Sequence, residues 1–335
     1  VITADGGPDG EIDFPYDHLV ISIGGEPNFF GIPGVEEYSL TMRGIEDAER
    51  VRNRVVERFE EVTLIQGGIP DSKLTFVVIG GGATGVEVAS EIHSLVHEAL
   101  APDYPNIDPH RVRIFLLEAM DHILPELDPA LRKTARTRLY NQNIEVKTGA
   151  MAEEITADRV KLKGGEEIMS ENVIWTAGNR PNEAISDLGL PIDEKNGIKV
   201  DEYLRVEDYP GIWSIGDCAA IPDITKEDGQ VLPPTAQAAS QEGKAVAKNV
   251  LAAIDGEELK EFKYKPMGQL VDLGGDFAVN EVMGVRFTGR LAAIFFRLAY
   301  LQRLDSPQGK LQQAADWILG LFIRPAVTQY HGADE

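Results

Sequence analysis

The amino-acid sequence predicts an α/β fold, because short apolar strands alternate with amphipathic helices along much of the chain. Residues 74–79 are apolar except for Thr75 and of strand length, residues 80–85 are rich in glycine, and residues 86–100 have the periodicity of a helix. A second strand is expected at 112–117. Strand, helix and strand in this order are typical of a βαβ unit.

The residues before this unit are expected to begin with a strand at 1–5, a turn at 6–10 and a returning strand at 16–23. Residues 44–66 carry an apolar side chain at every third or fourth position, so an amphipathic helix is expected there.

The alternation continues after the βαβ unit. The expected elements are a helix at 128–141, a strand at 144–148, a hairpin over 160–168, strands at 173–176 and 212–215, a helix at 235–251, and helical stretches at 284–304 and 311–323.

The composition limits the class of protein. The chain has 335 residues and 43% hydrophobic content, which suits two or three globular domains. Its 55 acidic and 32 basic residues give a formal charge of −23, which disfavours nucleic-acid binding and is also typical of a surface suited to concentrated salt. Cys218 is the single cysteine, so neither an internal disulfide nor a dithiol redox centre is expected.

Hydrolytic and metal-dependent chemistry are not indicated. The sequence has no GxSxG motif, and His93 and His97 lack a third ligand at suitable spacing, so they are interpreted as surface or interface histidines and no metal is predicted. There is no signal-peptide pattern at the start and no apolar run of the roughly 18–20 residues that a spanning helix needs. The sequence therefore predicts a soluble protein or one that lies on a membrane surface.

The strongest local signal is the glycine-rich loop at 80–85, which lies between the expected strand and helix. Gly80 permits a tight turn, Gly82 lets the backbone approach a diphosphate, and Gly85 allows the helix to pack closely. With Ala83 and Thr84 it would present the helix amino terminus to a dinucleotide. A glycine run alone would more often be a turn, but the flanking strand and helix favour a dinucleotide site.

Two carboxylates near this loop are candidates. Glu118 ends the second strand, where it could accept hydrogen bonds from the adenosine ribose and repel a 2′-phosphate, which favours NADH over NADPH. The alternative is a solvated carboxylate at a strand end. Glu87 lies in the first turn of the helix and would complement the helix dipole whatever its function.

These motifs together resemble the two-dinucleotide-fold flavoproteins, in which one nucleotide-binding domain is inserted in another. Residues 19–25 are similar to the strand that leads into an Ala-Thr-Gly turn, residues 175–182 to the second such turn, and residues 211–217 to the flavin-binding Gly-Asp strand. The resemblance implies that Asp217 holds the ribityl chain of FAD. It also implies that Gly24 and Gly216 contact FAD and that Ala177 and Gly178 contact NADH.

Two further segments are similar to the type II NADH:quinone oxidoreductases. Residues 236–241 resemble an AQxAxQ segment that passes the flavin ring, and residues 28–34 resemble the loop before the first long helix of those enzymes. The resemblance implies that Ala236 and Gln237 lie at FAD, that Gln237 and Gln241 line the quinone pocket, and that Glu87 lies near the nicotinamide.

The resemblance implies a domain order along the chain. The expected parts are a first part of the FAD domain (1–70), a Rossmann-like NADH domain (71–190), a second part of the FAD domain (191–256), and a carboxy-terminal membrane-surface or dimer region (257–335). The glycine motif for the ADP part of FAD would precede Val1, so the FAD domain is expected to be incomplete in this chain.

The carboxy-terminal region reverses the charge of the rest of the chain. Between residues 282 and 330 lie two acidic residues, Asp305 and Asp316, and six basic ones: Arg286, Arg290, Arg297, Arg303, Lys310 and Arg324. Apolar residues recur at helical spacing from 287 to 301, and Trp317, Leu321 and Phe322 follow, which predicts helices in a membrane interface. The alternative is a face for a homodimer or for domain packing.

The expected function is hydride transfer from NADH to FAD and electron transfer to a membrane quinone, without proton pumping. The chain is expected to be cytoplasmic and peripheral on the inner face of the cell membrane. The alternatives are a related flavin reductase with another acceptor and an NADH-binding sensor that holds no flavin.

Overall fold

A computed structural model describes residues 2–3, 11–12, 15–65, 67–226, 230–304 and 306–320. The chain divides into two compact units. One consists of residues 1–28 and 179–266, and the other of residues 29–178 and 267–335.

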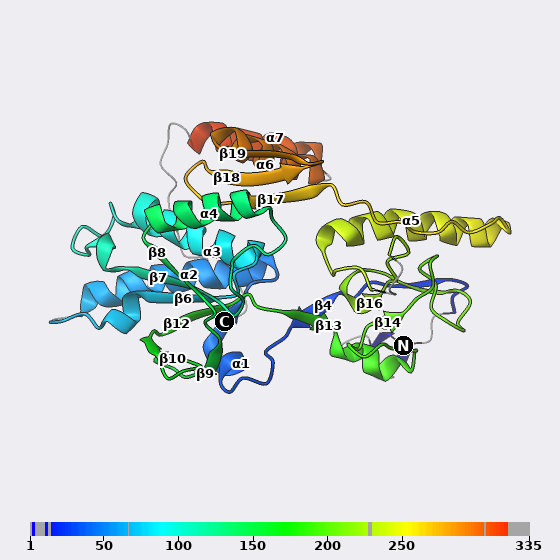
Figure 1. Cartoon of the computed structure of the whole chain (residues 1–335), viewed down its shortest axis with the longest axis horizontal. Coiled ribbons are helices and arrows are strands. Elements are labelled where there is room, and N and C mark those ends of the chain that lie inside the picture. The colour runs from blue at the N-terminus through cyan, green and yellow to red at the C-terminus, as the bar shows by residue number, and fades with distance from the viewer. Residues whose placement is uncertain are drawn as a thin grey trace. The chain divides into compact units, whose positions relative to one another are not determined.

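The second unit is built on a five-stranded parallel sheet in the order β5-β12-β6-β7-β8 (Figure 1). Its strands are β5 (Ser39–Thr41), β12 (Asn172–Trp175), β6 (Thr75–Ile79), β7 (Arg113–Glu118) and β8 (Ile144–Thr148). Helices α2 (Ile45–Leu64), α3 (Ala83–Ser94) and α4 (Pro129–Asn141) cover one face. A π-helical turn, Leu95–Leu100, extends α3.

The other face is covered by an antiparallel sheet of β9 (Ala152–Ile155), β10 (Arg159–Leu162) and β11 (Glu167–Met169). Side chains of the central strand β6 alternate between the two faces, as strand geometry requires. Phe76 and Val78 join the core under the helices, whereas Val77 and Ile79 join the core under the antiparallel sheet. A strand buried on both faces explains why residues 75–79 are nearly all apolar.

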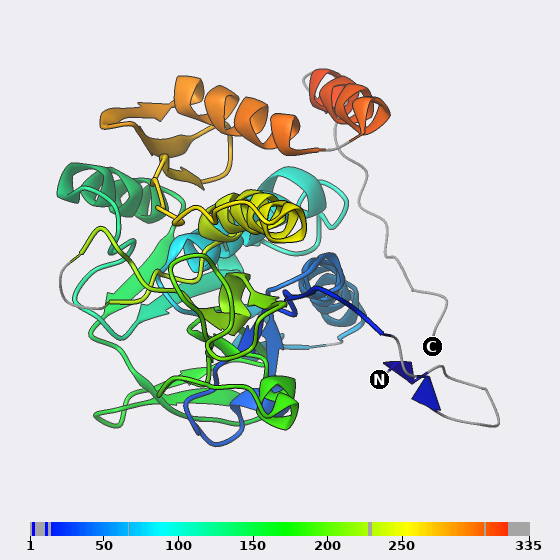
Figure 2. The same cartoon turned by 90° about the vertical axis from the view of Figure 1, so that its right-hand side faces the viewer.

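The carboxy-terminal part of this unit adds a third layer. Strands β17 (Gly268–Asp272), β18 (Ala278–Val282) and β19 (Val285–Gly289) form an antiparallel sheet, which packs against the helices through Val271, Leu273 and Val279. Helix α6 (Arg290–Arg303) lies along this sheet and α7 (Pro307–Gly320) follows it (Figure 2). In the described part of the chain no helix is long and apolar enough to cross a bilayer.

The first unit has smaller sheets around one core. Strands β3 (Leu19–Ile21) and β15 (Ile212–Ser214) pair in parallel, β4 (Gly25–Pro27) and β13 (Asn179–Pro181) pair antiparallel, and β14 (Ile198–Lys199) and β16 (Ala219–Ala220) pair in parallel. Helix α5 (Ala236–Asp255) packs on this core through Val246, and Trp213 is almost fully buried at its centre.

The remaining elements are short. They are β1 (Ile2–Thr3), β2 (Glu11–Ile12), α1 (Val35–Tyr38), and single turns at Asp71–Leu74, Pro109–Arg111, Glu183–Leu188 and Gly216–Cys218.

Two details differ from the sequence-based expectation. Strand β1 pairs with β2, not with the expected strand at 16–23, of which only Leu19–Ile21 is extended and paired with β15. The helix expected over 284–304 begins only at Arg290, because Val285–Gly289 is a strand of a hairpin. Met283 and Gly284 both have positive φ, as a two-residue hairpin turn requires. The helix expected at 311–323 is present as α7 as far as Gly320, and residues 321–323 lie outside the described residues.

The compact units also divide at other points than the expected boundaries at 70, 190 and 256. Helix α2 buries Val55 and Phe59 in the core beneath the parallel sheet, and β5 extends that sheet, so residues 29–70 pack with the glycine-loop unit. Residues 179–190 and 257–266 pack with the other unit, partly through Ile185 and Phe262.

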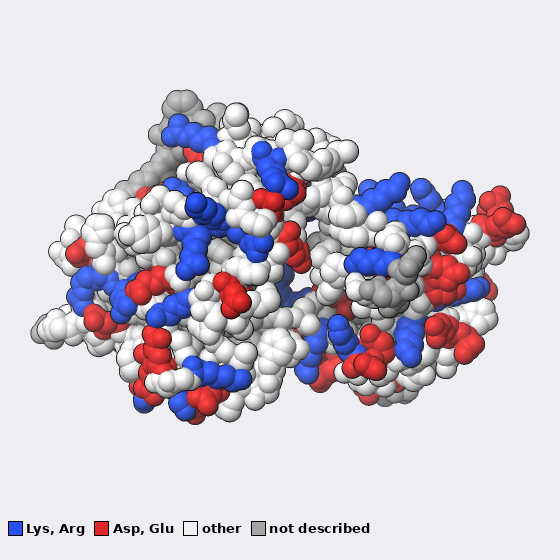
Figure 3. Space-filling model, viewed as in Figure 1, with Lys and Arg blue, Asp and Glu red and all other residues white. Residues whose placement is uncertain are grey.

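Basic side chains are unevenly distributed on the second unit. On the face of the molecule shown in Figure 3, Lys and Arg side chains gather over α4. This helix carries Arg132, Lys133, Arg136 and Arg138 and no acidic residue.

Candidate functional site

The glycine-rich loop joins the end of β6 to the start of α3, and two of its glycines are required by the backbone. Gly80 has φ +117°, and a Cβ on it would lie 2.8 Å from the amide nitrogen of Ala177. A Cβ on Gly85 would lie 1.8 Å from the carbonyl oxygen of Gly80. Any side chain at these two positions would therefore displace the loop or the neighbouring strand end.

Gly82 has a different environment. No atom lies within 4 Å of the position that its Cβ would occupy, and Gly82, Ala83 and Thr84 are all exposed. There is thus open space beside the first backbone amides of α3. Such amides lack intrahelical acceptors and attract anions such as a diphosphate.

Glu118 lies beside this loop at the end of β7, with its side chain almost buried. Its Oε2 accepts a hydrogen bond of 2.6 Å from the Gly81 amide, and its Oε1 accepts one of 2.8 Å from the Met120 amide. The carboxylate therefore fixes the glycine loop to the strand end. A carboxylate has further lone pairs that could accept from ribose hydroxyls.

Residues 176–178 meet the same loop from the other neighbouring strand, β12. Thr176 Oγ1 donates to the carbonyl oxygens of Ile79 at 2.9 Å and Gly80 at 3.2 Å, and Gly178 has φ +75°. Ala177 and Gly178 thus lie at the carboxyl ends of the parallel strands together with the glycine loop, which is where ligands bind in open α/β sheets.

Glu87, on α3, contacts the carboxy-terminal layer. Its Oε1 accepts a hydrogen bond of 3.1 Å from the Asp272 amide. The pKa of Glu87 is raised to about 7, mainly by burial. The charges of Asp272 and Glu91 also raise it, whereas the hydrogen bond from the Asp272 amide lowers it. Burial also raises the pKa of Tyr300, to which the charge of Glu87 contributes. A carboxyl group with this pKa can take up or release a proton near neutral pH.

A second set of candidate residues lies in the other unit, at the carboxyl ends of β3 and β15. Gly24 and Gly216 follow these parallel strands, both with φ +72°, and the space beside Gly24 is open. The carboxylate of Asp217 accepts a hydrogen bond of 2.5 Å from the side-chain amide of Asn179. This turn thus presents a carboxylate at a strand end, where it can bind hydroxyl groups.

Glu242 supports that turn from helix α5. Its Oε2 accepts a hydrogen bond of 2.7 Å from the Gly216 amide, and the residue is 2% exposed. Burial raises the pKa of Glu242, while the hydrogen bond from Gly216 opposes this. Neither Glu242 nor Asn179 was a predicted site residue. The contact between Glu242 and Gly216 joins residues 26 positions apart, so no local pattern in the sequence reveals it.

The predicted quinone glutamines, both on α5, are held by the segment that follows that helix. Tyr264 donates from its hydroxyl to Gln237 Oε1 at 2.9 Å. Gln241 bonds the main chain of Lys265 twice, donating to its carbonyl oxygen at 2.9 Å and accepting from its amide at 3.2 Å. Ala236 is the first residue of α5, which Thr235 caps by accepting from the Ala238 amide.

The two sets of residues fit the expected cofactors. The open backbone at Gly82 and the carboxylate of Glu118 suit the diphosphate and ribose of NADH. The open turn at Gly24 and the carboxylate of Asp217 suit the hydroxyl-rich chain of FAD. The described residues contain no group of three or more His, Cys, Asp or Glu side chains placed to hold a metal ion.

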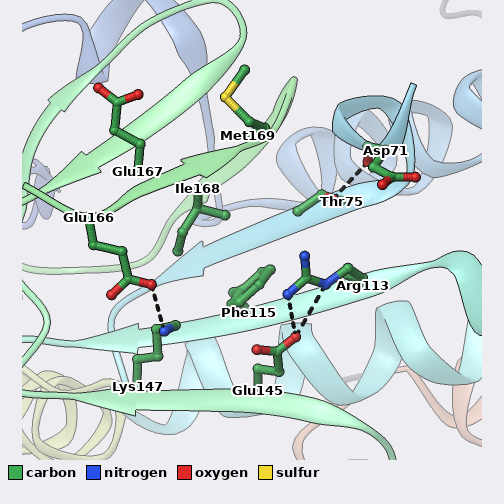
Figure 4. Close-up of a pocket in the computed structure, with 10 residues that line it drawn as sticks. All are labelled: Asp71, Thr75, Arg113, Phe115, Glu145, Lys147, Glu166, Glu167, Ile168 and Met169. Carbon is green, nitrogen blue, oxygen red and sulfur yellow. Dashed lines mark hydrogen bonds and ion pairs between the residues drawn. The ribbon is translucent and has the colours of Figure 1, made fainter.

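A charged pocket of about 290 Å³ lies at the opposite end of the parallel sheet, near the residues where β6 and β7 begin (Figure 4). Arg113 pairs with Glu145 at 2.8 Å and Lys147 pairs with Glu166 at 2.7 Å. Its cations are therefore neutralised by its own carboxylates. It lies away from the glycine loop and is not the dinucleotide site.

Comparisons with known proteins show the family to which the chain is related. The pyridine nucleotide-disulphide oxidoreductase family matches residues 3–243. A probable NADH dehydrogenase of Dictyostelium discoideum is 32% identical over 322 residues, which cover 95% of this chain and 70% of that protein. A type II NADH:quinone oxidoreductase of Haemophilus influenzae is 31% identical, over 80% of this chain and 63% of that protein.

This chain covers a smaller share of another relative. A solved structure has the same fold. An external alternative NAD(P)H-ubiquinone oxidoreductase of Arabidopsis thaliana is 39% identical over 63% of this chain but only 38% of its own length. The structure of NDH2 from Plasmodium falciparum in complex with NADH aligns over 95% of this chain and 80% of its own, with a TM-score of 0.84 and 22% identity.

The family match extends over most of the chain, and the two sets of strand-end residues supply what its cofactors need. The chain therefore belongs to the pyridine nucleotide-disulphide oxidoreductase family, and it is similar to an NADH dehydrogenase and to a type II NADH:quinone oxidoreductase.

Proposed function

We propose that this chain transfers electrons from NADH through FAD to a quinone, without pumping protons. The observation that carries the proposal is the contact between Glu118 and Gly81, which joins a carboxylate for the ribose to a loop for the diphosphate. The bound cofactors supply the hydride and electron chemistry, and the protein supplies their binding and orientation.

In this proposal the residues of the glycine loop bind NADH. Amides at Gly82, Ala83 and Thr84 face the open space at the start of α3 and would donate to the diphosphate. Glu118 would accept from the adenosine ribose. Ala177 and Gly178, beside Gly80, would line the path toward the nicotinamide, with Glu87 further along α3.

FAD would be bound by the other unit. Asp217 would accept hydrogen bonds from the ribityl hydroxyls, and Gly24 and Gly216 would allow the backbone to approach them, because both adopt positive φ without a side chain. Ala236 and Gln237, in the first turn of α5, would contact the flavin.

Gln237 and Gln241 would border the quinone. The hydroxyl of Tyr264 orients the amide of Gln237, and the main chain of Lys265 orients that of Gln241. The proposal therefore extends the quinone site to the segment at 264–265, which fixes both amides.

The membrane surface is proposed to be contacted by the carboxy-terminal helices, on the cytoplasmic inner face. Helix α6 buries Ala292 and Ala293 against its sheet but exposes Leu291 (77%), Ile294 (52%) and Leu298 (52%). Basic residues accompany these apolar side chains, which suits a helix lying at an anionic lipid surface. A homodimer face is the alternative, and vesicle binding separates the two.

The deciding experiment uses the whole protein. Flavin absorbance of the purified protein, followed by NADH oxidation with a short-chain quinone, is expected to show bound FAD and quinone-dependent turnover. Bound flavin with turnover only on soluble acceptors would instead indicate a different reductase. Absence of flavin with retained NADH binding would indicate a sensor and refute the proposal.

A further inference from the structure

Helix α4 carries four cations that form no ion pair with the described residues. The chain has a formal charge of −23, yet α4 carries Arg132, Lys133, Arg136 and Arg138 without an acidic residue. In the described part of the structure, neither Lys133 nor Arg136 forms an ion pair, and Arg132 Nε is buried without a hydrogen-bond partner. Lys and Arg side chains gather over α4 on the face shown in Figure 3.

A groove opens between α4 and the loop before β18. It has a volume of about 320 Å³ and is lined by Lys133, Thr134, Thr137, Arg138, Asn141 and Phe277. Lys133 and Asn141 are exposed, and the side-chain amide of Asn141 has no hydrogen-bond partner among the described residues. The groove therefore combines an ammonium group and an amide donor beside an aromatic wall.

Arg138 is held rigidly at the back of this groove. Its Nη2 donates to the Gly274 carbonyl oxygen at 2.8 Å, its Nε donates to that of Leu273 at 3.4 Å, and its guanidinium lies over the Phe277 ring, 5.3 Å from the centroid. A guanidinium has five N–H groups, so donors remain after these two bonds. A fixed guanidinium loses little freedom when it binds an anion.

The charge of the groove is not neutralised by its neighbours. The carboxylate of Asp276, next to Phe277, pairs with Arg297 at 2.7 Å. In the pocket of Figure 4, by contrast, Arg113 and Lys147 each have a carboxylate partner. Unlike that pocket, the groove at α4 contains a lysine, Lys133, that forms no ion pair with the described residues.

We propose that the groove between α4 and Phe277 binds a phosphate group. The Lys133 ammonium and the Asn141 amide would donate to its oxygens, and the remaining Arg138 donors would add charge from behind, since phosphate accepts strong hydrogen bonds from both kinds of cation. The phosphate belongs either to a small soluble molecule or to a lipid headgroup. This site is separate from the glycine loop and does not depend on the proposed function.

The test uses the whole protein with three variants. Lys133→Glu reverses the charge in the groove, and Asn141→Asp places a carboxylate at its wall. Lys248→Glu is the matched control, because Lys248 is an exposed lysine on helix α5 of the other unit. Calorimetric titration with inorganic phosphate is compared with co-sedimentation on phosphatidylcholine vesicles with and without phosphatidic acid. Any phosphate that binds at the glycine loop would bind equally to all variants, because none of the substitutions lies in that loop.

A soluble ligand predicts that inorganic phosphate binds the wild type and Lys248→Glu alike, and that Lys133→Glu and Asn141→Asp weaken binding at least about tenfold. If the ligand is a lipid headgroup, we expect the same order of affinities among the variants for phosphatidic acid vesicles and not for inorganic phosphate. In both cases added salt weakens binding. The proposal is overturned if the wild type binds neither probe, if Lys133→Glu binds as well as the wild type, or if Lys248→Glu loses as much affinity as Lys133→Glu.

Discussion

Glu118 Oε2 and the Gly81 amide are joined by a hydrogen bond of 2.6 Å, and the second oxygen of the same carboxylate accepts from Met120 at 2.8 Å. Two backbone donors thus converge on one side chain. Glu118→Gln cannot satisfy both, because an amide has one oxygen and its NH₂ group must face an N–H. We expect kcat/KM for NADH to fall roughly 10- to 100-fold, the equivalent of about 1.5–3 kcal/mol for a charged hydrogen bond.

The same substitution removes the negative charge that would repel a 2′-phosphate, so the preference for NADH over NADPH should shrink. Steady-state kinetics with both cofactors measure this. Glu145→Gln, on the adjacent strand β8, is the control, since Glu145 pairs with Arg113 and does not touch the loop. An unchanged cofactor preference in Glu118→Gln would show that this carboxylate does not face the ribose.

The glycines of the loop should separate folding from binding. Gly85→Ala places a Cβ 1.8 Å from the Gly80 carbonyl oxygen, so we expect it to destabilise the fold by about 3 kcal/mol or more. Gly82→Ala meets no atom within 4 Å and should leave stability nearly unchanged, while its methyl group occupies the approach of the diphosphate and weakens NADH binding.

Thermal unfolding and NADH titration of both variants check this expectation. Gly68→Ala is the control, because its Cβ would also meet open space, outside the loop. Equal NADH affinity in Gly82→Ala and the wild type would place the diphosphate elsewhere.

Glu87 should make stability depend on pH. Its pKa is about 7 in the folded chain against 4.5 for an ordinary glutamate. Between these values the folded state keeps a proton that the unfolded state has lost, so the free energy of unfolding should fall as pH rises from about 4.5 to about 7. The loss is at most on the order of 3 kcal/mol. Glu87→Gln should remove this component of the pH dependence.

Chemical denaturation at a series of pH values measures this pH dependence of the free energy of unfolding. Glu60→Gln, an exposed carboxylate on α2, is the control and should retain the wild-type profile. Parallel profiles for Glu87→Gln and the wild type would mean that the Glu87 carboxyl titrates normally.

Glu242 is expected to matter for flavin binding. Glu242→Ala leaves the Gly216 amide without its acceptor in a buried place, which typically costs about 1–3 kcal/mol, and lets the turn that carries Asp217 move. Glu242→Gln keeps one acceptor and should be milder. The flavin-to-protein ratio after dialysis measures the effect. Glu258→Ala, just beyond α5, is the exposed control, and equal flavin retention in all three variants would exclude a supporting role.

Local spacing was enough to predict the centre of the fold. A buried strand, three glycines and a helix follow one another within 20 residues, so the loop at 80–85 and the strand ending at Glu118 could be found from the sequence. Contacts between distant segments could not. Glu87 meets Asp272 from 185 residues away, and the direction of each side chain depends on how the layers pack.

The misassigned helix has a similar cause. Phe287 and Leu291 are four residues apart, which fits a helix, but the strand β19 gains hydrogen bonds to β18 that no local pattern reveals. Gly289, with φ +84°, marks the change from strand to helix. Tertiary pairing thus decided the conformation of residues 285–289 against their apparent periodicity.

The exposed apolar face of α6 provides the test of membrane association. Removing residues from 284 onward would also remove β19 from its sheet, so substitutions are the cleaner change. Leu291 and Leu298 lie two turns apart on one exposed face, and Leu291→Glu with Leu298→Glu places two charges there without disturbing the buried Ala292 and Ala293. We expect this double variant to be released from anionic vesicles, because each burial of a leucine in lipid contributes about 1.5–3 kcal/mol.

The matched control is Leu64→Glu with Leu251→Glu, which adds the same charges at leucines that are 81% and 61% exposed on α2 and α5. Co-sedimentation with vesicles and gel filtration are measured on the same samples. Release of the α6 variant alone, with its oligomeric state unchanged, supports a membrane face. Retained vesicle binding with a dimer that dissociates would instead make α6 an interface between two copies of the chain, because the same leucines would then be covered by protein and not by lipid.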